Sequence, residues 1–233
     1  MKKFLVVLLA LAMVFGLGSV AFAADTQIAD YADLAGVPAE QQAAIYRLTA
    51  LGVLAGDGVG GDFRPEDTIT RAEFAKIAIF LAGKADAVDL YASFAPAYAD
   101  VQDGTWYEGY VNAAVAFGYM KGYTDGTFKP GQTVTMQEVA TVLLRIAGYT
   151  DALKGTWPND YIRKANDTEI IAYVDFVGPR AATRAEVASI ANETLDLNMV
   201  AEVENEVAAG LVEKTGNPHF VYDSYRRFVQ MYG

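Results

Sequence analysis

The chain has 233 residues, of which 53% are hydrophobic, and it contains no cysteine. Its formal charge of -11 argues against nucleic acid or an anionic membrane as the main partner, because both favour clustered lysine and arginine. Without disulfides, an exported chain of this kind must take its stability from a packed core or from stacked repeats.

The first 23 residues have the pattern of a secretory signal peptide. Lys2 and Lys3 precede an apolar run over residues 4–17, and the small-residue site at 21–23 follows it. The run is shorter than the roughly 20 apolar residues that span a bilayer, and no later stretch is long enough either. We therefore predict an exported protein that has no membrane span once the signal peptide is removed.

A first structural unit is expected over residues 28–83. Pro38 suits a helix start, and apolar residues at helical spacing predict a helix over 38–54. The glycine-rich stretch GDGVGGDFRP follows at 56–65, and a second helix is predicted over 71–81. The link over residues 83–96 is loosely patterned, with a short helix expected between residues 87 and 94.

A second unit over residues 97–149 repeats the first. It has a first helix over 106–119, the stretch GYTDGTFKP at 122–130, and a further helix after residue 135. Four positions of the first unit recur at a constant offset of 65 residues: Phe63, Pro65, Thr70 and Glu73 reappear as Phe128, Pro130, Thr135 and Glu138. A period of this size is typical of one supersecondary unit per copy.

The second helix of each copy begins with a capping box, in which a threonine oxygen accepts an early helix amide and a glutamate reaches back to the threonine amide. The pairs are Thr70 with Glu73, Thr135 with Glu138, and Thr183 with Glu186. These glutamates are interpreted as caps, not as catalytic acids. Each copy therefore reads as helix, glycine-rich turn and capped helix.

The third copy, over residues 157–197, is degenerate. Trp157 stands five residues before Ile162, as Trp106 stands before Val111, but the glycine-rich turn is missing. Residues 198–233 match no repeat. They are expected to form a helical acidic stretch over 200–212, followed by an aromatic tail that holds the single histidine of the chain.

These tandem copies resemble S-layer homology modules of exported bacterial proteins. The resemblance rests on GYTDGTFKP at 122–130, ITRAEF at 69–74 and ATRAEV at 182–187, and it covers about residues 28–197. It implies a mainly α fold, in which three tandem helix-turn-helix repeats form a pseudo-threefold assembly with grooves between neighbouring copies.

The resemblance also implies a function, which is non-covalent anchoring to the cell wall of Gram-positive type. Family members bind secondary cell wall polysaccharide, typically bearing ketal-linked pyruvate, and some bind peptidoglycan; other S-layer proteins are further candidate partners. The family lines its groove with the arginine of the TRAE motif, the glycine-rich turn and an aromatic residue of the first helix. Carried over to this chain, the ligand-binding residues are Arg71, Arg184, Gly122, Gly126, Trp106 and Trp157.

The chemistry of these residues agrees with that role. A guanidinium grips a planar carboxylate through two parallel hydrogen bonds, and the early amides of the helix add positive potential. Glycine lets a ligand approach the backbone closely, and sugars favour flat aromatic faces. No catalytic residue, metal ligand or cofactor is expected.

Each copy departs from the family pattern at one place. Met136 replaces the arginine in the second copy, which should weaken its groove unless Lys121 or Lys129 substitutes. Glu40 stands in the first copy where the tryptophans stand in the others, and the third copy lacks the turn. A working groove must therefore combine pieces from neighbouring copies.

Several alternatives stay open. Trp106 and Trp157 are interpreted about equally as core anchors or as ligand platforms, and the aspartates of the turns as turn residues, not calcium ligands. A wall-active glycoside hydrolase needs only two carboxylates, although one histidine and no cysteine build neither a triad nor a zinc site. In a third hypothesis, residues from 200 onward dock another surface protein that the anchor displays.

Overall fold

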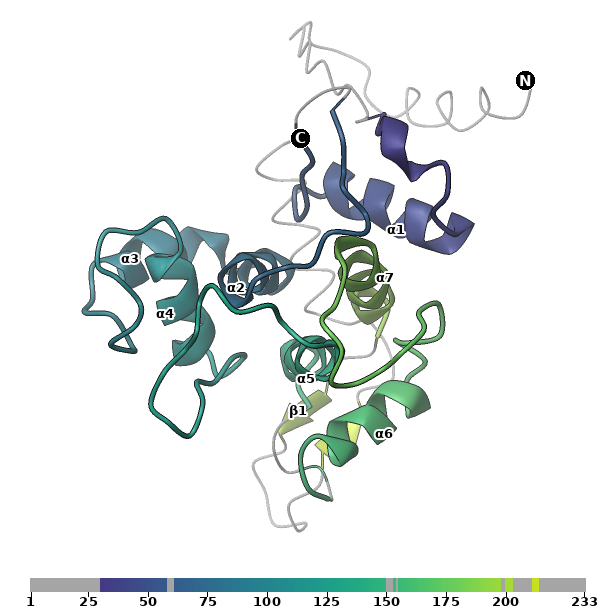
Figure 1. Cartoon of the computed structure of the whole chain (residues 1–233). Coiled ribbons are helices and arrows are strands. Elements are labelled where there is room, and N and C mark those ends of the chain that lie inside the picture. Colours follow the sequence, from purple (N-terminus) through teal and green to yellow (C-terminus); the bar gives the residue numbers. More distant parts are fainter. Residues whose placement is uncertain are drawn as a thin grey trace, which may run out of the picture.

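The computed structural model describes residues 30–57, 61–149, 153 and 155–197, together with two short strands further along (Figure 1). The signal peptide predicted over residues 1–23 lies outside this part, as does most of the tail after residue 197. None of the helices in the described part has the length and apolar character needed to cross a bilayer.

The three capped helices form as the sequence predicts. They are α2 (Arg71–Leu81), α5 (Met136–Ile146) and α7 (Arg184–Leu195), and each carries a complete capping box. In α2, the Thr70 hydroxyl accepts a hydrogen bond from the Glu73 amide, and the Glu73 carboxylate accepts one from the Thr70 amide at 2.8 Å. The prediction that these glutamates are caps is confirmed.

The first helices of the copies are α1 (Ala39–Ala50), α4 (Glu108–Ala116) and α6 (Asn159–Asp167). The first two end earlier than predicted, because Gly52 and Gly118 adopt positive φ angles of 69° and 74° just beyond them. The 3₁₀ helix η1 (Ala32–Leu34) precedes α1. In the link, η2 (Ala85–Ala87) and α3 (Val88–Ala92) confirm the expected short helix.

A closed cycle of backbone hydrogen bonds joins the three copies at the residues just before the capped helices. The Val134 amide donates to the Ile69 carbonyl at 2.9 Å, the Ala182 amide donates to Val134 at 2.9 Å, and the Ile69 amide donates to Ala182 at 3.3 Å. Figure 1 shows α2, α5 and α7 around the middle of the molecule, with α1, α4 and α6 outside them. The copies thus form a ring, while its rotational symmetry stays a prediction.

Each first helix packs on the capped helix of another copy. Helix α4 lies against α2, α6 lies against α5, and α1 lies against α7, so the first copy closes the ring on the third. Ile45 and Leu48 of α1 are fully buried, as is Ile190 of α7. The order of elements within a copy is as predicted, but the apolar face of each first helix is covered by a neighbour.

The mainly α fold is confirmed, with one correction in the tail. Strand β1 (Val200–Glu202) pairs antiparallel with β2 (Leu211–Glu213), so the prediction of a helical stretch over 200–212 is wrong for these residues. A short apolar run is compatible with a helix or with a strand, and pairing with a second strand elsewhere in the sequence decides between them. The hypothesis that the tail docks another protein concerns residues that are largely outside the described part.

Candidate ligand-binding site

The start of each capped helix lies against a loop of the next copy in the ring. The Arg71 amide donates to the Gln132 carbonyl at 2.8 Å, the Arg184 amide to Asp67 at 2.8 Å, and the Met136 amide to Arg180 at 2.9 Å. We call these contacts the Arg71 junction, the Arg184 junction and the Met136 junction. The first amide of each capped helix is therefore hydrogen-bonded within the ring, and a ligand at a junction contacts side chains instead of this amide.

At the Arg71 junction, the guanidinium is buried in the turn of the second copy. Its Nε donates to the Phe128 carbonyl at 2.8 Å, one Nη donates to the Lys121 carbonyl at 2.9 Å, and the other binds Glu138 Oε1 at 2.7 Å. The guanidinium carbon lies 4.6 Å from the ring centre of Tyr123, and the Arg71 side chain is only 4% exposed. This arginine is matched in charge and hydrogen bonding by the protein itself.

At the Arg184 junction, the guanidinium reaches the turn of the first copy in the same way. Its Nε donates to the Phe63 carbonyl at 2.8 Å and one Nη donates to the Ala55 carbonyl at 2.7 Å. Among the described residues, no carboxylate lies within ion-pair distance of it. Burial lowers the pKa of Arg184, and the nearby positive charge of Arg64 lowers it further.

At the Met136 junction, a different arginine supplies the guanidinium. Arg180 precedes α7 and forms two hydrogen bonds with Glu186, at 2.5 and 3.0 Å, while one Nη also lies 3.1 Å from the sulfur of Met136. The Glu186 hydrogen bond raises the pKa of Arg180. The cation beside Met136 is therefore neither Lys121 nor Lys129, the two candidates from the sequence.

Sequence reasoning missed Arg180, although a signal was present. It stands three residues before its threonine cap, where the other copies have Asp67 and Gln132, so it is the only one of the three that brings a positive charge. This gain coincides with the loss of arginine at Met136. A comparison of residues 136 and 180 with their equivalents in the other copies could have shown that Arg180 supplies the positive charge that is lost at Met136.

Gly122 has a packing role in the turn of the second copy. Its amide donates to the Tyr98 hydroxyl at 2.8 Å, and a Cβ placed on it would collide with the Tyr98 ring and lie 2.7 Å from the Thr127 carbonyl. Gly126 has a φ of 80° and closes the turn through a 3.0 Å bond from its amide to the Tyr123 carbonyl. Both glycines shape the loop that receives Arg71.

Lys129 belongs to the same turn. Its ammonium pairs with Asp125 at 2.9 Å and lies 4.3 Å from the Tyr123 ring centre. Thr127 hydrogen bonds and the Lys129 charge lower the pKa of Asp125 to about 2. The interpretation of Asp125 as a turn residue agrees with its 3.0 Å bond from the Thr127 amide.

A recurring aspartate holds each glycine-rich turn in place. Asp33 accepts hydrogen bonds from the Phe63 and Arg64 amides at 2.9 and 2.6 Å, and Asp100 accepts them from the equivalent pair in the second copy. The sequence YAD, which occurs at residues 31–33 and again at 98–100, carries this aspartate in both copies. We call this aspartate with its two amide bonds a clamp. It fixes the backbone of the residue after the phenylalanine at the junction, which is Arg64 in the first copy and Lys129 in the second.

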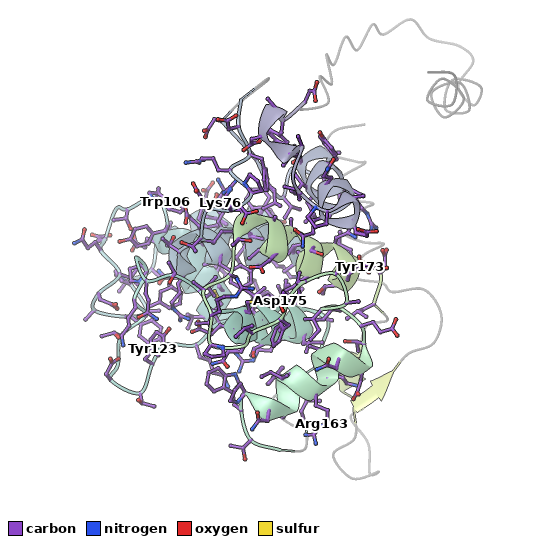
Figure 2. The ribbon with its side chains drawn as sticks, turned by 45° about the vertical axis from the view of Figure 1, so that its right-hand side comes forward. Lys76, Trp106, Tyr123, Arg163, Tyr173 and Asp175 are labelled. Carbon is purple, nitrogen blue, oxygen red and sulfur yellow. The ribbon has the colours of Figure 1, made fainter. Side chains whose placement is uncertain are left out.

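The two tryptophans lie on the surface and not in the core. Trp106 is 58% exposed and contacts the rings of Tyr107 and Tyr110, while Trp157 is 48% exposed and donates to the Thr141 hydroxyl at 3.1 Å. Figure 2 shows Trp106 and Tyr123 on the same side of the molecule. No described contact joins either tryptophan to Arg71 or Arg184.

The fold and these junctions define a helical repeat protein in which neighbouring copies meet at each junction. Residues 30–75 and 97–140 match the S-layer homology domain. The chain thus belongs to the S-layer homology family through its first two copies, as the motifs indicated. The third copy, over 157–197, lies outside these matches, so its assignment stays a prediction.

Three similar proteins have names that place them in the cell wall or at the cell surface. The Middle cell wall protein of Brevibacillus brevis is 34% identical over 204 residues, which cover 88% of this chain and 19% of that protein. The Surface layer protein of Brevibacillus choshinensis is 39% identical over 171 residues, 73% of this chain and 15% of its own length. The Cell surface protein of Thermoanaerobacter kivui is 28% identical over 211 residues, 90% and 26% of the two chains. The chain therefore spans about a quarter or less of each relative's length.

Proposed function

We propose that this chain anchors an exported protein non-covalently to the bacterial cell wall by binding a secondary wall polysaccharide that carries ketal-linked pyruvate. S-layer homology proteins attach to the cell surface, and the names of the relatives agree with a role that is not enzymatic. The observation that carries the proposal is that Arg184, the arginine of a TRAE motif, lies at a junction between two copies with no carboxylate within ion-pair distance in the described part of the chain.

A carboxylate is the ligand group that suits such junctions. A guanidinium offers a planar set of N–H donors that matches a carboxylate, and it keeps its charge at every physiological pH. The net charge of -11 does not oppose this, because charges beyond about 8 Å are screened at physiological salt. A pyruvate ketal presents one carboxylate fixed on a sugar ring, next to apolar C–H faces.

The exposed tryptophans supply the second element of a carbohydrate site. Trp106 and Trp157 stand at the starts of α4 and α6 with about half of their surface in solvent. A large aromatic surface left exposed is available for packing against a sugar ring.

Binding to purified wall sacculi tests the proposal. The full chain should sediment with sacculi and lose this binding when the pyruvylated polymer is extracted, and the extracted polymer should compete with intact sacculi for the chain. Sacculi that keep the polymer but have lost its pyruvate provide the matched control. Equal binding before and after extraction refutes the ligand, and in that case digestion of the glycan strands shows whether peptidoglycan is bound instead.

A further inference from the structure

The three junctions are alike in plan but unequal in charge. In the Arg71 junction, Glu138 neutralises the arginine at 2.7 Å, and both side chains are nearly buried, at 4% and 13% exposure. In the Met136 junction, Glu186 neutralises Arg180 through both carboxylate oxygens. In each case the capping glutamate of one copy takes the position of a ligand carboxylate.

The Arg184 junction lacks this internal partner. The corresponding capping glutamate is Glu73, whose Oε2 caps Thr70, and no ion pair joins it to Arg184 in the described part of the chain. In the second copy, the Tyr123 hydroxyl binds Glu138 Oε1 at 2.8 Å and holds it toward the arginine. The turn of the first copy is one residue longer, and Asp57 stands there where Tyr123 stands in the second copy: the Asp57 amide donates to the Asp62 carbonyl at 3.0 Å, as the Tyr123 amide donates to Thr127 at 2.8 Å. A carboxylate side chain accepts hydrogen bonds and does not hold Glu73 as the tyrosine hydroxyl holds Glu138.

A second guanidinium lies close to Arg184. Arg64 follows Phe63, the residue whose carbonyl binds Arg184, and its backbone is held at a φ of 60° by the Asp33 clamp. Its side chain is 51% exposed, and in the described part of the chain its ion pairs lie on the surface, with Asp57 at 3.2 Å and Asp67 at 3.9 Å. Exposed pairs of this kind contribute little and exchange readily for another carboxylate.

We propose that the carboxylate of the wall polymer binds at one place, between Arg184 and Arg64, and that the Arg71 and Met136 junctions are closed internally by Glu138 and Glu186. This inference rests on the proposed function and narrows it to a single acidic sugar per chain. The ligand carboxylate takes the position at Arg184 that a capping glutamate takes at the other two junctions. Arg64 then acts as a second ligand-binding residue, outside the TRAE motif.

Calorimetry with a small probe tests this inference. The probe is a methyl hexoside with a pyruvate ketal on O4 and O6, titrated into the full chain, and the same hexoside without the ketal is the control. We expect one probe bound per chain, with affinity lowered about 10- to 100-fold by Arg184→Gln and about 10-fold by Arg64→Gln, since a charge-assisted hydrogen bond is lost in each. Arg180→Gln, the matched control at the Met136 junction, should leave affinity and stoichiometry unchanged.

The outcomes separate this inference from the function on which it rests. Two or three probes per chain, or a loss with Arg180→Gln equal to that with Arg184→Gln, overturns the single site while leaving the function intact. A parent chain that binds neither probe nor pyruvylated sacculi overturns both. Because Arg184 also bonds two carbonyls, its variant is checked by circular dichroism; if it unfolds, the surface variant Arg64→Gln decides, and unchanged affinity there refutes the inference.

Discussion

Replacing Arg71 by methionine tests the interpretation that this arginine is an internal latch. Methionine is the residue that the chain itself carries at the equivalent position, Met136, so the substitution suits a helix start of this fold. The variant removes three hydrogen bonds and leaves the Glu138 carboxylate with its capping bonds and the Tyr123 hydroxyl. We expect a folded but clearly less stable protein.

The structure sets the size of this loss. Removing one partner of a buried ion pair costs about 3–5 kcal/mol, because the other charge stays buried. Glu138 is 13% exposed and keeps its capping bonds, and the methionine side chain can pack on the Tyr123 ring, so the lower end of about 3 kcal/mol applies. For a chain of this size, that loss corresponds to a fall in Tm of about 6–12 °C.

A double-mutant cycle in urea measures the effect. Glu138→Gln removes the negative charge but keeps a side chain that can complete the capping box, so the double variant with Arg71→Met should regain at least about 1 kcal/mol over the sum of the single losses. A loss below about 1 kcal/mol for Arg71→Met refutes the latch. An additive cycle refutes the coupling between the two residues.

Three further predictions follow from the turns. Gly122→Ala should destabilise the fold by about 1–3 kcal/mol, because its Cβ has no space, whereas Gly131→Ala, which faces open space, should stay within about 0.5 kcal/mol; urea unfolding of the pair decides. Burial, and then the hydrogen bond to Glu138, raise the pKa of Tyr123 to about 12. In an ultraviolet titration, Tyr123 should therefore ionise well after tyrosines with the ordinary pKa of 10.0. The stability that the protonated Tyr123 contributes to the fold is complete below pH 10 and is lost as the pH rises toward 12. Burial opposes ionisation of Asp33, but the hydrogen bonds from the two turn amides outweigh it and lower the pKa of Asp33 below 3.8. The stability that Asp33 contributes to the fold is therefore present above that pH and is lost on acidification. Asp33→Asn should reduce the loss of folding stability that the parent protein shows in this acidic range.

The elements with a local signal could be predicted from the sequence almost to the residue. The helix predicted over 71–81 is observed at Arg71–Leu81, because a capping box states where a helix begins. The first helix of the second copy was predicted over 106–119 and observed at Glu108–Ala116, since apolar spacing continues past the glycine that ends it. The residues of the repeat were thus clear, while the ends of the uncapped helices were not.

The contacts between copies could not be predicted in the same way. Arg71 and Glu138 are 67 positions apart, and nothing local tells which copy's glutamate an arginine will meet. The packing of each first helix on the capped helix of another copy could not be predicted for the same reason. The apolar face of a first helix fits any of the three similar capped helices, and only closure of the ring decides between them. The role of Arg180 also depends on these contacts between copies, because Arg180 lies beside Met136 only when the ring is closed.

The contact of α1 with α7 affects how the chain can reach its native state. In the described part of the chain, the first α-helix is covered by the last one, so synthesis of the third copy must be complete before α1 can bury Ile45 and Leu48. A pairing that spans almost the whole ring has a high contact order, and such contacts form late. A chain threaded through a secretion channel from its amino end would therefore stay open until its last repeat has emerged, which favours export before folding.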